Sequence, residues 1–224
     1  MDGDGSIQVN HWRYKNLQYR LVIKLKYCNE NLSMLNLIVG HIGGKVRFSE
    51  SEEKTTYKFV IWVVDNRTQI QKIIQIFIKY PPLTSRINAQ LAFMYECLKK
   101  NDIEWYLLNR NKKYLNTNIG NINMDNTYFN EWLSGFIEAE GCFSIRTTSN
   151  NHSFSIGQND DKYILDKIIN HFKITNQLKK KKDKFWHIEV YKKSILINII
   201  NHCIKYPLLG EKILSLNKIR DLFK

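Results

Sequence analysis

The chain has 224 residues, of which 34 are Lys or Arg and 21 are Asp or Glu, so its formal net charge is +13 at pH 7. Hydrophobic residues make up 43% of the chain, which is enough for a sizeable core and excludes global disorder. No apolar stretch reaches the roughly 18 residues that a membrane-spanning helix needs. The four cysteines are far apart without a CxxC pair, which excludes a zinc ribbon and a dense disulfide framework.

The positive charge predicts a polyanionic partner, either nucleic acid or an anionic membrane surface. The excess is shared between the two halves of the chain, so a folded surface that spans both halves would meet the polyanion. A basic protein without such a partner is the alternative. The chain is also rich in Ile, Asn and Lys, which A/T-rich codons encode, and this favours an A/T-rich genome such as an organellar one.

The first half begins with strands. Residues 6–10 alternate polar and apolar side chains, and residues 17–26 do so with Val22 as the exception, which predicts two antiparallel strands with one buried face. Later, a helix with an apolar stripe ends at Pro81 and Pro82. In chain order, the patterns predict strands at 6–10 and 17–26, a helix at 31–42, strands at 45–50 and 55–64, and helices at 67–79 and 84–100.

The second half repeats this order behind one additional helix. The run of four lysines at 179–182 falls at the end of an expected strand or hairpin. The patterns predict a helix at 128–140, strands at 142–149 and 152–157, a helix at 160–172, strands within 177–190, and helices at 192–205 and 210–223.

Two segments of the chain match one another without a gap. Residues 59–81 align with 185–207, so that Phe59 matches Phe185, and both segments end in Ile-Lys-Tyr-Pro. A duplicated domain of about 100 residues explains this match, because the period is far longer than that of a solenoid. We therefore predict an α+β protein of two pseudo-symmetric αββαββα repeats, each with a four-stranded antiparallel sheet. The expected boundaries are 1–103 for the first repeat, 104–124 for an Asn-rich linker and 125–224 for the second repeat.

The helix expected at 128–140 contains the sequence LSGFIEAEG, which ends at Gly141. Its small residues Ser134 and Gly135 would let two helix backbones approach closely, as an interface between the repeats requires. The first five residues, MDGDG, match only the end of a second copy of this sequence. Asp4 and Glu140 therefore hold equivalent positions, where a helix ends and its dipole disfavours negative charge.

If the two motif helices pair, Asp4 and Glu140 come together, and two close carboxylates repel each other unless a cation lies between them. Oxygen ligands suit Mg²⁺, which takes one or two carboxylates together with waters and substrate phosphates. This arrangement predicts metal-assisted hydrolysis of a phosphodiester. The alternative is that the acidic residues at 2–4 form a simple turn and that Glu140 is a solvated helix end.

The two motifs and the order of strands and helices resemble the LAGLIDADG homing endonucleases, and the resemblance covers nearly the whole chain. Two motifs in one chain are similar to the monomeric, pseudo-twofold members. In that family the last acidic residue of each motif binds the divalent metal, which implies Asp4 and Glu140 as ligands. A basic residue five positions after the proline that ends a helix lies near the active site, and Arg86 and Lys212 match.

The family also has a polar residue near the end of the second strand that orders active-site water. Gln158 fits this description in the second repeat, whereas Tyr27 stands at the aligned position in the first repeat and departs from the pattern. The resemblance therefore implies catalytic roles for Asp4, Glu140, Gln158, Lys212 and Arg86, with an asymmetry between the two halves.

The polar faces of the strands would lie in the major groove of DNA, where each base pair presents its own pattern of donors and acceptors. Each of these side chains taken alone is better explained by a phosphate contact or by solvation than by base reading. The candidates are Ser6, Gln8, Asn10, Arg20, Lys24, Lys26, Lys45, Arg47 and Lys58 in the first repeat, and Ser144, Arg146, Thr148, Ser155, Lys180 and Lys182 in the second.

The resemblance implies a monomeric, intron-encoded endonuclease that uses Mg²⁺ and cuts double-stranded DNA at a specific site in the mitochondrion or another organelle. Two alternatives remain, a maturase that binds its host intron RNA on the same fold, and a DNA-binding protein that has lost catalysis. Because the apolar turn before Asp2 is missing, we expect the reading frame to continue upstream and to supply the first motif's helix.

Overall fold

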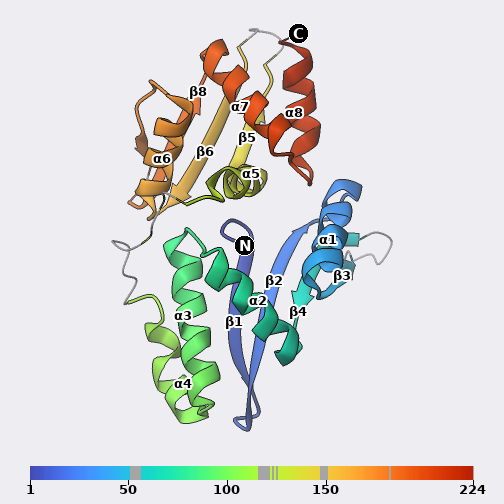
Figure 1. Cartoon of the computed structure of the whole chain (residues 1–224), viewed down its shortest axis with the longest axis vertical. Helices are drawn as coiled ribbons and strands as arrows, with labels where there is room; N and C mark the ends of the chain where they lie inside the picture. The colour runs from blue at the N-terminus through green and yellow to red at the C-terminus, as the bar shows by residue number, and fades with distance from the viewer. Residues whose placement is uncertain are drawn as a thin grey trace. The chain divides into compact units, whose positions relative to one another are not determined.

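The computed structural model of the chain describes residues 1–50, 57–115, 122, 124, 126–146, 151–181 and 183–223. They divide into two compact units, Met1–Ile122 and Asn123–Lys224. Each unit contains a four-stranded antiparallel sheet with helices packed on one face (Figure 1), which confirms the predicted α+β class. None of the helices that the structure describes has the length and hydrophobicity needed to cross a membrane.

The first sheet has the strand order β1-β2-β4-β3. Alternation puts Ile7, Leu21 and Val64 in one row across the sheet, and all three are buried against the helices. Among the described residues no helix packs on the opposite face, and in both sheets the face away from the helices is called the open face below. The elements of this unit are β1 (Gly5–Trp12), β2 (Asn16–Lys26), α1 (Asn29–Ile42), β3 (Lys45–Glu50), β4 (Tyr57–Val64), α2 (Arg67–Lys79), α3 (Ser85–Lys100) and α4 (Ile103–Asn109).

Side-chain caps fix where the helices of the first unit begin. Asn66 accepts a hydrogen bond from the amide of Gln69 at the start of α2, and Thr84 accepts one from the amide of Ile87 at the start of α3. Buried Ile70, Ile73 and Ile74 form the apolar stripe of α2 that the spacing predicted. The predicted elements of this half agree with the structure to within two residues at their described ends.

The expected linker at 104–124 was wrong in its first part. α4 begins at Ile103, and the side chain of Asp102 caps it by accepting hydrogen bonds from two amides. Tyr106 is buried, and its hydroxyl donates a hydrogen bond to the carbonyl of Val9 at 3.1 Å. This segment belongs to the first unit because its aromatic side chains pack on the core, which the short, aperiodic sequence did not reveal.

The second sheet has the order β5-β6-β8-β7, the same topology as the first. Phe154, Ile156 and Ile188 are fully buried on its helix-covered face. β5 and β7 are shorter than the strands expected there, and residues 147–150 lie outside the described part of the chain. The elements are α5 (Phe129–Glu140), β5 (Gly141–Ser144), β6 (Ser153–Asn159), α6 (Lys162–Phe172), β7 (Lys179–Lys181), β8 (Phe185–Val190), α7 (Lys193–Lys205) and α8 (Lys212–Asp221).

Candidate functional site

Both motifs end in a glycine whose amide closes a helical turn. The Gly5 amide donates to the carbonyl of Met1 at 3.0 Å, and the Gly141 amide donates to the carbonyl of Ile137. A Cβ atom at Gly141 would lie 2.7 Å from that carbonyl oxygen and 3.1 Å from the ring of Phe154, so a larger residue does not fit. A strand starts at each glycine, and the last motif carboxylate therefore sits where a helical turn changes into a strand.

The first acidic residue of motif one, Asp2, caps the start of α3. Its carboxylate accepts hydrogen bonds from the amide of Leu83 at 3.2 Å, from the amide of Thr84 at 2.9 Å and from the hydroxyl of Thr84 at 2.6 Å. Negative charge at a helix N-terminus is stabilising because the helix dipole is positive there. Asp2 thus joins the motif to a helix that lies about 80 residues away in the sequence.

Glu138 holds the corresponding place in motif two. Its two carboxylate oxygens accept hydrogen bonds from the amides of Gly210 and Lys212, both at 3.0 Å, at the start of α8. The same carboxylate therefore fixes the backbone of Lys212, one of the predicted active-site residues. Neither Asp2 nor Glu138 stands out in the sequence, because both act through contacts with residues that are distant in the chain.

Arg86 and Lys212 bind the ends of the two motifs. Arg86 donates hydrogen bonds to the carbonyl oxygens of Gly5 at 2.8 Å, Gly3 at 2.6 Å and Asp2 at 3.1 Å. The Lys212 ammonium donates to the carbonyl oxygen of Gly141. Carbonyls at a helix end carry partial negative charge, so a cation is favourable there. Each predicted cation is thus held beside the motif of its own unit.

The last motif carboxylates remain accessible. Asp4 is exposed and Glu140 is partly exposed. Within the described part of the chain, no group of three or more His, Cys, Asp or Glu side chains could hold a metal ion. One carboxylate in each unit suits a hard cation such as Mg²⁺, which takes most of its ligands from water and phosphate. The residues present therefore fit a divalent ion that is bound together with a substrate.

Gln158 lies near the end of motif two, two residues beyond Ile156, the strand partner of Gly141. It is on the helix-covered face, and its amide donates to the carboxylate of Asp161 at 3.4 Å. The register of both sheets makes Leu25 its counterpart in the first unit, so the alignment with Tyr27 was wrong by two residues. The apolar Leu25 still departs from the family pattern, as Tyr27 would.

Ser134 does not lie on an accessible face of α5. It is buried, its hydroxyl donates to the carbonyl of Tyr206 at 2.7 Å, and the same oxygen lies 3.2 Å from Nε2 of His202. Ser134 therefore joins α5 to α7 within the second unit, and the interface role expected for it stays a prediction. Gly135, one residue on, is exposed.

The open face of the first sheet gathers most of the predicted DNA-contacting residues. Strand pairing sets Gln8 beside Arg20, and sets Lys24 and Arg47 on either side of Ile61. The Lys24 ammonium lies 4.2 Å above the centre of the Phe59 ring, a cation–π contact on this face. The predicted residues on the face are Ser6, Gln8, Asn10, Arg20, Lys24, Lys26, Lys45 and Arg47.

Lys58 does not belong to this set, because it alternates with Phe59 and shares the side of buried Val60 and Trp62. Its long side chain nevertheless brings the ammonium to 5.7 Å from the centre of the Phe59 ring. Sequence alone could not separate Lys58 from its neighbours, since exposed lysines occur on both sides at a strand end.

On the second sheet, Ser144 and Ser155 lie on the open face, and Arg146 is exposed just after β5. Lys180 was assigned to the wrong side. It pairs with Trp186, and its ammonium lies 5.6 Å from the centre of that ring. The remaining candidates, Thr148 and Lys182, lie outside the described residues.

The neighbours of Lys180 take its place on the open face of the second sheet. Lys179 pairs with His187, and Lys181 pairs with Phe185. Neither lysine could be predicted from the sequence, because a run of four lysines gives no sign of which members lie on which face. The signal that could have found them is the match between Phe185 and Phe59, since Phe59 lies on the open face of the first sheet.

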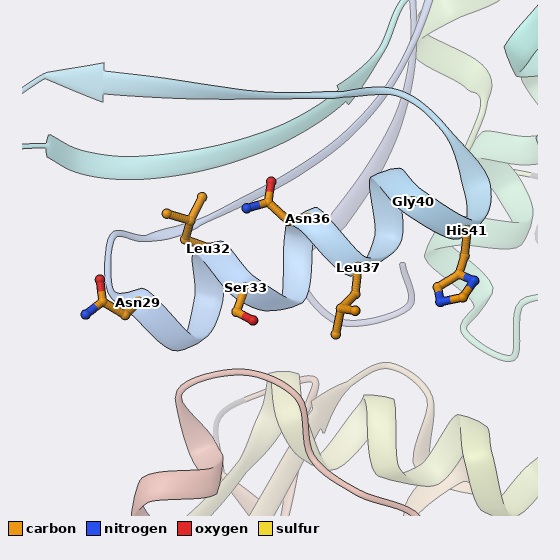
Figure 2. Close-up of a pocket in the computed structure, with 7 residues that line it drawn as sticks. All are labelled: Asn29, Leu32, Ser33, Asn36, Leu37, Gly40 and His41. Atoms are coloured by element: carbon orange, nitrogen blue, oxygen red, sulfur yellow. The ribbon is translucent and has the colours of Figure 1, made fainter.

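A groove of about 550 Å³ runs along α1, away from the residues described above (Figure 2). None of the predicted site residues lines it, and its walls combine amide, hydroxyl and aliphatic side chains of one helix. The lining residues are Asn29, Leu32, Ser33, Asn36, Leu37, Gly40 and His41.

The chain is similar in sequence to known proteins. The sequence profile described as "LAGLIDADG endonuclease" matches residues 1–97 and 133–223. "Probable intron-encoded endonuclease aI3" of Dictyostelium citrinum is 50% identical over 226 residues, which cover 100% of this chain and 92% of that protein. The protein of the same name from Debaryomyces hansenii is 44% identical over 254 residues, which cover 97% of this chain and 36% of that protein.

The fold has solved counterparts as well. The crystal structure of the LAGLIDADG meganuclease I-CpaMI bound to uncleaved DNA matches with a TM-score of 0.75 at 16% identity, and the match covers 99% of this chain and 88% of that chain. The profile match extends over both units and includes Asp4, Arg86, Glu140 and Lys212. The chain belongs to the LAGLIDADG endonuclease family.

Proposed function

We propose that this chain is a site-specific endonuclease that cuts double-stranded DNA by metal-assisted hydrolysis, and that an intron of a mitochondrial genome encodes it. The observation that carries the proposal is the repeated arrangement at the two motif ends. In each unit an accessible carboxylate, Asp4 or Glu140, directly precedes a strand, and a fixed cation, Arg86 or Lys212, lies at the same turn. The names of the close relatives support the intron-encoded origin.

Asp4 in the first unit and Glu140 in the second would each bind divalent metal, which we propose is Mg²⁺. Such an ion, when bound, neutralises charge on the phosphate and favours deprotonation of an attacking water. Lys212 and Arg86 add positive charge near the reacting phosphate, and their hydrogen bonds to the motif carbonyls keep them in place before DNA arrives. Glu138 and Asp2 position these cations indirectly, because they cap the helices that carry them.

The open faces of the two sheets would bind the DNA. Lys24 and Lys26 in the first unit, with Lys179 and Lys181 in the second, would contact phosphates, and shorter polar residues such as Gln8 and Asn10 would reach base edges. Phosphate contacts release counterions, so affinity should fall steeply as salt concentration rises.

The proposal is tested with a duplex that contains the exon–exon junction of the host gene, from which the encoding intron is absent. This duplex is called the junction duplex. We expect one double-strand cut in Mg²⁺ and none in EDTA, while a duplex with a shuffled junction stays intact. If the chain leaves the junction duplex uncut but binds the intron RNA selectively, the proposal is wrong and the maturase function is correct.

A further inference from the structure

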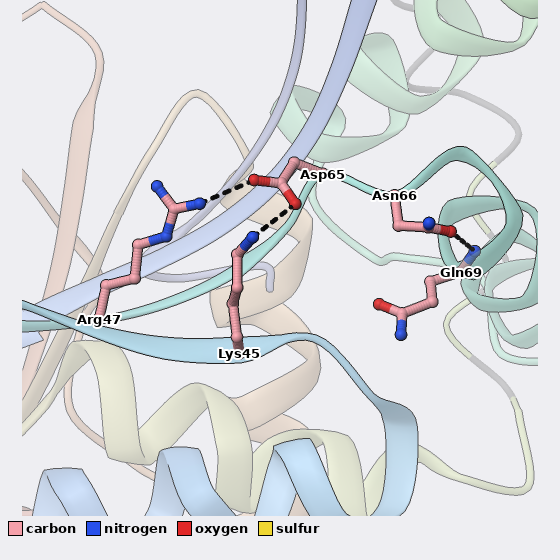
Figure 3. A network of polar contacts seen from close by, with 5 residues as sticks. All are labelled: Lys45, Arg47, Asp65, Asn66 and Gln69. Carbon is pink, nitrogen blue, oxygen red and sulfur yellow. Dashed lines mark hydrogen bonds and ion pairs between the residues drawn. The ribbon is translucent and has the colours of Figure 1, made fainter.

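Asp65 places a carboxylate among the cations of the first open face. It directly follows β4 and continues the alternation of Ile61 and Val63, which lie on that face. The next residue, Asn66, caps α2 by accepting a hydrogen bond from the amide of Gln69 at 3.0 Å (Figure 3). The backbone of Asp65 is therefore held between a strand and a capped helix.

Two predicted DNA-contacting cations bind Asp65. Lys45 Nζ lies 3.0 Å from Oδ1, and Arg47 Nη2 lies 2.9 Å from Oδ2, as Figure 3 shows. The hydrogen bond from Lys45 has the largest effect on the pKa of Asp65 and lowers it. Burial opposes this effect, and the charges of Lys45, Arg47 and Arg20 lower the pKa further. The carboxylate is thus ionised at neutral pH and forms ion pairs with both Lys45 and Arg47.

The cluster of Lys45, Arg47 and Asp65 contributes little to the stability of the fold. The side chains of Lys45 and Arg47 are 52% and 49% exposed, and that of Asp65 is 33% exposed. Ion pairs with such exposure add little to the free energy of unfolding, because water screens them and ordering long side chains costs entropy. A carboxylate on a face built to meet phosphates also weakens binding to DNA in general. Its presence there calls for a functional explanation.

A cavity of about 420 Å³ adjoins Asp65 on the side where β2 extends beyond the end of β4. The β2–β4 pairing stops at Leu21 and Val64, whereas β2 continues back to Asn16. Polar side chains from three elements converge at this place and provide both donors and acceptors. The lining residues are Asn10, Leu17, Gln18, Tyr19, Arg20, Asp65 and Arg67.

We propose that Asp65 determines the specificity of DNA binding by keeping Lys45 and Arg47 from phosphates of non-target DNA and by accepting a hydrogen bond from a cytosine amino group in the target. An ionised carboxylate only accepts hydrogen bonds, and in the major groove the N4 amino group of cytosine is the donor that suits it. The carboxylate repels any phosphate that approaches it. DNA sequences without a cytosine at this position therefore gain no hydrogen bond that would offset this repulsion. This inference rests on the proposed DNA-binding function.

The test compares the wild type with Asp65→Asn, which removes the charge and keeps the shape. Asp166→Asn is the matched control, because Asp166 also forms an exposed ion pair, with Lys162 at 2.7 Å on α6. Affinity is measured in Ca²⁺ over a range of salt concentrations for the junction duplex and for a random-sequence duplex. Base preferences are measured by selection from a randomised duplex library.

With Asp65→Asn we expect affinity for the random duplex to rise several-fold. Its salt dependence should steepen by about one to two units of log Kd per log salt concentration, because two cations become available for phosphates. Preference for cytosine at one position of the selected site should be lost. The inference is wrong if Asp65→Asn matches Asp166→Asn in the random-duplex affinity, or if every base preference is unchanged.

Arg47→Gln provides a second measurement that does not depend on Asp65→Asn alone. In the wild-type background this change should weaken random-duplex binding little, since Asp65 already occupies Arg47. In the Asp65→Asn background the same change should weaken it several-fold. Equal effects in both backgrounds would overturn the inference. If the wild type neither prefers nor cuts the junction duplex, the proposed function itself fails, which is a separate outcome.

Discussion

The side chain of Lys212 donates a hydrogen bond to the carbonyl of Gly141, the residue with which motif two ends. Arg86 makes the same contact with Gly5 in the first unit, at 2.8 Å. The two cations differ in chemistry, because the planar guanidinium of Arg86 donates to three carbonyls, whereas the compact ammonium of Lys212 donates to that of Gly141. The same position in the duplicated fold is thus filled in two ways.

Lys212→Met should slow DNA cleavage by about tenfold or more and leave DNA affinity within about twofold, because the proposed mechanism uses the positive charge of Lys212 near the reacting phosphate. Lys212→Arg should retain more activity than Lys212→Met, since arginine already serves in the first unit. Cleavage rates under single-turnover conditions check this. Equal loss in the two variants would contradict a role for the charge.

Glu138→Ala should lower the free energy of unfolding by about 1–3 kcal/mol, because two amides at the start of α8 lose a charged acceptor. Glu131→Ala on the same helix is the control, since Glu131 is exposed, and it should change stability by less than about 0.5 kcal/mol. Urea denaturation measures both. Similar stability of the two variants would show that the cap does not matter.

The lowered pKa of His202 should make the stability of the fold depend on pH. Burial, together with the nearby His171, lowers the pKa of His202 to about 4 from its ordinary value of 6.5. Below pH 6.5 the unfolded chain takes up a proton that the folded chain refuses until about pH 4, so the free energy of unfolding should fall through this window. His202→Gln should reduce that fall in thermal melts at pH 7 and pH 5. An unchanged difference between the two pH values would contradict the assignment.

Two substitutions in the turn between β1 and β2 should increase the stability of the fold. Arg13 and Tyr14 both have left-handed backbone conformations, with φ of 49° and 55°, and the amide of Lys15 bonds to the carbonyl of Trp12 at 2.9 Å. Such a turn favours Asn-Gly. The double change Arg13→Asn, Tyr14→Gly should raise the free energy of unfolding by about 1–2 kcal/mol. No increase in urea denaturation would mean that the stacking of Tyr14 on His11 outweighs the backbone strain.

Sequence periodicity predicted the elements well because it reports burial directly. The stripe of Ile70, Ile73 and Ile74 and the alternation along β2 reappear in the structure almost residue for residue. α4 was missed because it is short and its burial depends on Tyr106 reaching β1. Leu25 was missed as the counterpart of Gln158 because insertions between the repeats hide the strand register, which hydrogen-bond pairing fixes.

The site was harder to predict than the fold. The positions of Asp4 and Glu140 came from the motif, those of Arg86 and Lys212 came from their spacing after Pro81 and Pro207, and all four roles stay predictions. The hydrogen bonds of Glu138 join residues more than 70 positions apart, and no local pattern reports them. Lysines at strand ends were misassigned because their exposure is similar on both sides, as Lys180 shows. The motif therefore identifies the acidic residues of the site, whereas contacts between distant residues determine how the side chains around them are held.

The most direct test of the account is the effect of Glu140→Gln on cleavage of the junction duplex in Mg²⁺, with DNA affinity measured in Ca²⁺ on the same preparation. The change removes the charge of a proposed metal ligand and keeps its shape, and Glu131→Gln on the same helix serves as the control. We predict that Glu140→Gln binds the duplex as the wild type does and no longer cuts it, whereas Glu131→Gln does both. Cleavage by Glu140→Gln near the wild-type rate would contradict the assignment of this carboxylate to the metal and with it the central claim.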